Sequence, residues 1–115
     1  MTSDPCGLSD FNRIETYGRA ELFLTLVGTG VSRSLYELTA HDTQTRALLF
    51  DLRVEASLDT LIARGRQADV SADEQAMTIA FDCACRILDT EAYRRATHFH
   101  LHIQPEGETL APPLT

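Results

Sequence analysis

Three histidines alternate with apolar residues near the end of the chain, in the segment Thr97-His98-Phe99-His100-Leu101-His102-Ile103. Alternate residues of a β-strand point to the same side, so the three imidazoles are expected to share one face. Neighbouring members of such a row start about 6.6 Å apart and can tilt onto one ion, whereas the first and third converge poorly. A zinc site would therefore need two of them and a ligand from another strand. The candidate metal ligands are His98, His100, His102 and His41.

An overlapping eight-residue stretch, His98 to Pro105, is similar to the signature of the histidine-triad nucleotide hydrolases. In that family the middle histidine attacks a phosphate, so the resemblance implies a nucleophilic role for His100. The chain departs from the family pattern between Thr90 and Thr97, where no Gly, Asn, Gln or Ser is present to bind phosphate. Gln104 also stands where the family prefers an apolar residue. A histidine-triad-like hydrolase or a metal-binding protein is therefore the alternative function, and the cofactor is left unknown.

Other chemically active residues are sparse. The three cysteines, Cys6, Cys83 and Cys85, are odd in number, which is not the pattern of a disulfide framework. Cys83 and Cys85 are expected within a helix, where residues two apart point about 200° from each other and cannot share a metal. Cys83 is expected in the core. The sequence contains no Gly-x-Ser-x-Gly, P-loop, paired CxxC or His-Glu-x-x-His motif.

Composition limits the partners of the protein. The 115 residues suit a single domain, and 43% of them are hydrophobic. The net charge is −7 and every basic residue is Arg, so direct binding of nucleic acid is not expected. No apolar run reaches the ~20 residues of a membrane-spanning helix, and the first residues do not resemble a secretory signal. We therefore expect a cytoplasmic protein with no membrane partner.

The pattern of apolar residues predicts an α+β domain over residues 8–104, with flexible termini at 1–7 and 105–115. Ser9 could cap a helical turn that includes Leu8, Phe11 and Ile14 and ends at Gly18. Alternation then predicts strands over 20–27, 33–41 and 46–54, and the histidine segment forms a fourth strand. Helical periodicity predicts helices from Ser57 to about Gly65 and from Ser71 to Asp89. The expected fold is a four-stranded antiparallel sheet in the order β-β-β-α-α-β, with both helices packed on one face.

Alternation also divides the sheet into an inner and an outer face. The side chains expected to form the core with the helices are Leu22, Leu24, Leu26, Tyr36, Leu38, Ala40, Leu48, Phe50, Leu52, Val54, Phe99, Leu101 and Ile103. The outer face is expected to contain Glu21, Phe23, Thr25, Val27, Leu35, Glu37, Thr39, His41, Leu49, Asp51, Arg53 and the three histidines of the last strand.

The outer face mixes apolar and charged residues, although a solvated sheet face is usually polar. An apolar patch with a polar rim commonly marks an interaction site, and the histidines would be part of it. The candidate partner-binding residues are Phe23, Val27, Leu35, Glu37, Leu49 and Asp51. The N-terminal segment, a second copy of the chain or another protein could cover this face. The sequence therefore favours a small acidic protein-binding or accessory protein, either an inhibitor or a self-associating module such as a homodimer.

Overall fold

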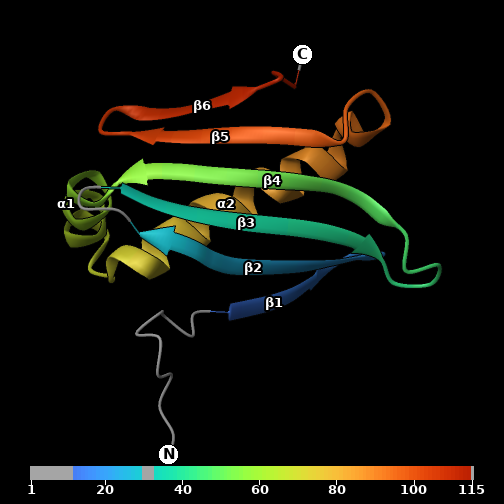
Figure 1. Cartoon of the computed structure of the whole chain (residues 1–115), viewed down its shortest axis with the longest axis horizontal. Helices are drawn as coiled ribbons and strands as arrows, with labels where there is room; N and C mark the ends of the chain where they lie inside the picture. The colour runs from blue at the N-terminus through green and yellow to red at the C-terminus, as the bar shows by residue number, and fades with distance from the viewer. Residues whose placement is uncertain (1–11, 30–32, 115) are drawn as a thin grey trace, which may run out of the picture.

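The computed structural model describes residues 12–29 and 33–114, apart from the side chain of Thr29. Figure 1 shows one sheet with two helices packed behind it. In chain order the elements are β1 (Asn12–Tyr17), β2 (Ala20–Thr29), β3 (Arg33–Asp42), β4 (Leu48–Ser57), α1 (Leu58–Ala68), α2 (Ala72–Asp89), the short 3₁₀ helix η1 (Ala92–Arg94), β5 (His98–Gln104) and β6 (Gly107–Ala111).

The six strands lie side by side in the order in which they occur along the chain. All neighbours are antiparallel except β4 and β5, which are parallel. The parallel pair arises because α1 and α2 cross behind the sheet between these two strands, as a parallel connection requires. The α+β class is confirmed. The expectation of four antiparallel strands is wrong, because the sheet is six-stranded and mixed.

The two additional strands lie at the two edges of the sheet. The expected helical turn up to Gly18 is instead β1, which forms a hairpin with β2 through a two-residue loop at Gly18 and Arg19. Gly18 has a φ of 60°, so it serves the tight turn rather than the end of a helix. Leu8, Ser9 and Phe11 lie outside the described residues.

The C-terminal segment was expected to be flexible from residue 105 onward. Residues 107–111 instead form β6, which returns along β5 with Gln104 opposite Gly107. The intervening pair Pro105 and Glu106 forms the turn between these two strands. The sheet therefore ends at β6 and not at the histidine strand β5.

A bulge in β4 changes which side chains face the helices. Ala40 of β3 is opposite Phe50, but the next residue, His41, is opposite Leu48, so Leu49 is an extra residue. Leu49 packs against the core, whereas Leu48 is 50% exposed. The expected alternation, with Leu48 in the core and Leu49 on the outer face, is therefore reversed at this end of the strand.

The helices begin where their capping residues indicate. The Ser57 hydroxyl accepts a hydrogen bond from the Thr60 amide, and the Ser71 hydroxyl accepts one from the Glu74 amide. The long helix α2 buries Ala76, Ala80, Cys83, Ala84 and Ile87 against the inner face of the sheet. Within the described ranges, neither helix is long and apolar enough to cross a membrane.

Candidate functional site

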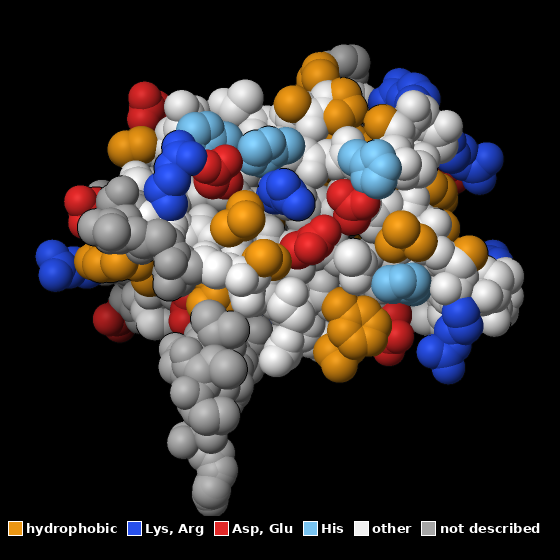
Figure 2. All heavy atoms as spheres, viewed as in Figure 1, with side chains coloured by type: hydrophobic (Ala, Val, Ile, Leu, Met, Phe, Trp, Pro, Cys, Tyr) orange, Lys and Arg blue, Asp and Glu red, His pale blue; other side chains and the backbone are white. Residues whose placement is uncertain are grey.

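The front of the sheet in Figures 1 and 2 is the face opposite the helices, and we call it the open face. Its central rows run across β2 to β5, with the register partners Phe23, Thr39, Asp51 and His98 in one row and Thr25, Glu37, Arg53 and His100 in the next. Figure 2 shows histidine, acidic, basic and apolar side chains mixed over this surface. No described helix covers it, as Figure 1 shows.

Two carboxylate–histidine pairs join β4 to β5 on the open face. Asp51 Oδ2 lies 2.6 Å from His98 Nδ1, and Glu55 Oε1 lies 3.1 Å from His100 Nε2. The parallel pairing of these strands places Asp51 directly beside His98 and Glu55 beside His102, so Glu55 reaches back diagonally to His100. Glu55 also forms an ion pair with Arg33 of β3.

A carboxylate on one ring nitrogen orients an imidazole and leaves the other nitrogen available as a base or ligand. The His98 side chain is 80% exposed, so its second nitrogen is open to solvent. The predicted metal ligands are not brought together, however, because β4 separates His41 from the histidines of β5. Residues 12–29 and 33–114 contain no group of three His, Cys, Asp or Glu side chains placed to hold an ion. The metal site stays a prediction that this arrangement does not favour.

His41 has a different environment from the other histidines. Its ring meets Phe23 edge-on with 6.1 Å between the ring centres. Its Nδ1 atom is enclosed and has no hydrogen-bond partner within the described part of the chain. His41 is therefore packed on the β2 side of the open face rather than directed toward the carboxylate–histidine pairs.

The apolar residues of the open face lie on both sides of its charged centre. Phe23 is 36% exposed and Val27 is 50% exposed, both on β2, while Leu48 lies on β4. Leu35 is half-buried and lines a hollow of about 470 Å³ together with Arg33, Arg53 and His100. Of the predicted partner-binding residues, Phe23, Leu35, Glu37 and Asp51 lie on the open face, Val27 is exposed at a bulge, and Leu49 faces the helices.

The outer face expected from the sequence pattern does not include Leu48, Ile14, Glu55 or Arg33. Ile14 of β1 is opposite Phe23 and is 57% exposed, so it extends the apolar area to the edge of the sheet. Glu55 follows the alternation Asp51, Arg53, Glu55, and extending that strand beyond Val54 would have found it. Leu48 requires the bulge, for which the sequence carries no distinct signal.

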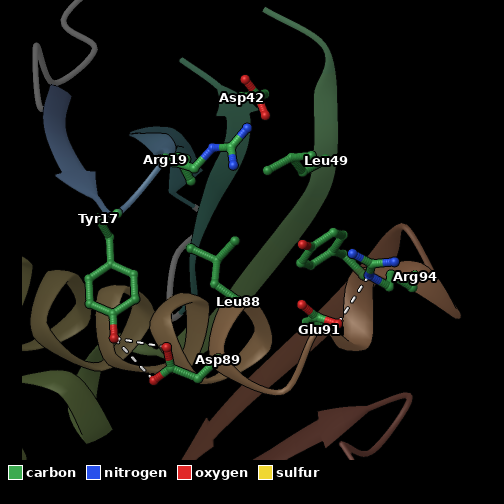
Figure 3. A pocket seen from close by; sticks show the side chains of 11 residues that line it. Tyr17, Arg19, Asp42, Leu49, Leu88, Asp89, Glu91 and Arg94 are labelled. Atoms are coloured by element: carbon green, nitrogen blue, oxygen red, sulfur yellow. Dashed lines mark hydrogen bonds and ion pairs between the residues drawn. The ribbon is translucent and has the colours of Figure 1, made fainter. Parts of the chain in front are cut away.

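A second hollow, of about 450 Å³, lies on the helix side at one end of the sheet (Figure 3). Leu49 and Leu88 project into it, and Arg19, Asp42 and Arg94 stand at its margin. The Tyr17 hydroxyl donates to Asp89 at 2.9 Å, which connects β1 to the end of α2.

Two pKa shifts at the second hollow reflect its internal bonding. The hydrogen bond to Asp89 raises the pKa of Tyr17. Backbone amides of Thr45 and Gln44 donate to Asp42 and lower the pKa of that carboxyl, because they stabilise its charged form. These side chains stabilise the hairpin turn and the helix end, and we assign the second hollow no ligand.

The two described cysteines do not form a reactive site. Cys83 is buried under the sheet, and desolvation raises its pKa to about 11. Burial and the nearby Asp89 also raise the pKa of Cys85, which lies on another side of the helix. Both are free thiols. Raised pKa values leave little thiolate near neutral pH, which agrees with the expected structural role of Cys83.

Comparison of the chain with protein-family models, with curated proteins and with solved structures gives no match. The inference of function therefore depends on the chemistry of the open face.

Proposed function

We propose that the protein is a small accessory protein that binds another protein surface through its open face. The observation that carries the proposal is the side of the sheet that no described helix covers, where Phe23 and Leu48 are 36% and 50% exposed beside a charged centre. Protein interfaces combine apolar contact area with polar and charged groups, and Arg and aromatic residues are enriched in them.

The size of the open face supports the same function. Six strands about 4.8 Å apart and up to ten residues long cover on the order of 700 Å². A stable protein–protein complex buries about 800 Å² on each partner. One face of this sheet is therefore large enough for a specific complex without a contribution from the helices.

The charges of the molecule favour a protein partner over nucleic acid. The net charge of −7 repels phosphate backbones, and the open face itself contains carboxylates at Glu37, Asp51 and Glu55. We place the protein in the cytoplasm, because its two described cysteines are free thiols as in a reducing compartment. The hydrolase and metal-binding alternatives gain no further observation in their favour.

Site-specific photo-crosslinking in the cells that make the protein tests this function. A benzophenone amino acid replaces Phe23 on the open face, and in a control chain it replaces Ile62 of α1, because both residues are 36% exposed. We expect a discrete crosslinked product from position 23, its loss when Leu35→Thr is added, and no equivalent product from position 62. Identical products from both positions, or none from position 23, would contradict the proposal.

A further inference from the structure

Glu37 and Arg53 are opposite each other on the two central strands of the sheet, β3 and β4. Side chains in such a cross-strand pair start about 5 Å apart. Their neighbours are paired, since Asp51 contacts His98 and Glu55 contacts both His100 and Arg33. Among the residues that the structure describes, neither Glu37 nor Arg53 makes a side-chain ion pair or hydrogen bond. The middle of the open face therefore presents one uncommitted carboxylate beside one uncommitted guanidinium.

We propose that the partner on the open face is a second copy of the chain, related by a two-fold axis that runs along the strands between β3 and β4. This inference rests on the proposed function and names its partner. The rotation lays β3 of one copy over β4 of the other, so residues that are opposite within one sheet become opposite across the interface. Arg53 of each copy then faces Glu37 of the other, and the symmetry forms this ion pair twice.

The charges select this axis over the other two-fold arrangement of stacked sheets. An axis perpendicular to the strands would lay β4 over β4 and β3 over β3, which brings the Arg53 residues of the two copies toward each other, and likewise the Glu37 residues. Like charges in a desolvated interface cost free energy, whereas opposite charges set the register of the complex. The pair Glu37 and Arg53 is thus self-complementary only when β3 runs in the same direction in both copies.

The same axis gives the outer rows suitable contacts. β2 of one copy lies over β5 of the other. Phe23 and His98 belong to the same row across the sheet, so the Phe23 ring of one copy lies near His98 of the second copy. Stacked sheets cross at about 30°, which displaces residues at the edges more than residues near the axis. The Arg53–Glu37 contacts are close to the axis and are the ones that the geometry fixes best.

Charge reversal with rescue tests the inference on the full chain. Light scattering over a wide concentration range is expected to show the wild-type mass doubling. Arg53→Glu and Glu37→Arg each replace two ion pairs by two like-charge contacts, so each is expected to weaken dimerisation about tenfold or more. The double variant Glu37→Arg with Arg53→Glu restores the complementarity and is expected to dimerise nearly as the wild type does. Arg66→Glu on the exposed side of α1 makes the same change in net charge as Arg53→Glu and should leave dimerisation unaltered.

Each contrary outcome identifies a different failure. A wild-type chain that is monomeric at every concentration overturns the second-copy inference. The proposed function would then be supported only by a crosslinked product between position 23 and another protein. A dimer that neither single reversal weakens, or that the double variant does not restore, overturns the two-fold pairing. Circular dichroism checks the fold of every variant, and Arg53→Gln and Glu37→Gln replace any reversal that unfolds. These neutral variants are expected to weaken the dimer less than the reversals do.

Discussion

Leu48 and Leu49 are adjacent in β4, yet the first is half exposed on the open face and the second projects into the hollow beside α2. The extra residue opposite Ala40 and His41 produces this arrangement, because a bulge rotates the strand on one side of it. The bulge therefore decides which leucine belongs to the binding surface and which belongs to the core. The alternating pattern of the sequence cannot show it, because both residues are leucines.

Replacing each leucine in turn by alanine tests this assignment. We expect Leu49→Ala to lower the free energy of unfolding by about 1–3 kcal/mol, since it removes partly buried apolar contacts with the core. Leu48→Ala should change the free energy of unfolding by no more than about 0.5 kcal/mol, because its side chain is half in water. Urea unfolding with an unchanged m-value measures both. A larger loss for Leu48→Ala than for Leu49→Ala would show that the bulge is misplaced.

At the level of elements, the sequence predicted what periodicity and capping specify. The three strands with strongly alternating apolar residues and both helices are confirmed, including the caps at Ser57 and Ser71. The edge strands were missed for a physical reason. All six residues of β1 are exposed, so they carry no core pattern, and β6 buries none of its five residues.

The sequence predicted which residues lie on the open face better than it predicted which of them contact each other. Asp51 and the histidines were expected on one face, and the structure confirms that placement. Which carboxylate contacts which histidine depends on the parallel register of β4 and β5, which the crossover through α1 and α2 sets. An antiparallel fourth strand would have paired them differently.

Gly65 shows how closely the two helices are connected. The sequence suggested that a helix ends near this residue, but α1 continues to Ala68. A Cβ at Gly65 would lie 2.7 Å from the Val70 carbonyl oxygen, because the link between the helices passes directly over it. Gly65 therefore does not end the helix. Because it has no side chain, the link between the helices can pack closely against it.

Gly65→Ala is expected to destabilise the protein by about 1–3 kcal/mol, because the backbone of the link must move. This net loss already includes the gain of about 1 kcal/mol that alanine provides inside a helix. Gly28→Ala in β2 is the control, since apart from its chain neighbours no atom of the described residues lies within 4 Å of the added methyl group. Thermal unfolding compares the two variants. A higher melting temperature for Gly65→Ala than for the wild type would contradict the close approach.

The whole molecule is a sheet with two unlike sides. One side is covered by α1 and α2 and contains the core, whereas the other combines exposed apolar residues with carboxylate–histidine pairs and the opposed Glu37 and Arg53. The described helices cover one side only, so the described part of the chain leaves a surface about the size of a standard interface exposed on the other side. In the proposed dimer, a second copy of the chain covers this surface.

Tryptophan fluorescence can report whether this surface is covered, because the chain contains no natural tryptophan. Phe23→Trp places a single reporter on the open face, and Ile62→Trp places one on α1 at the same 36% exposure. As the protein concentration rises, the emission of Phe23→Trp is expected to shift to shorter wavelength and to be quenched less by acrylamide, while Ile62→Trp stays unchanged. Emission and quenching of Phe23→Trp that are the same at every concentration would show that the open face remains in water, which contradicts the proposed dimer.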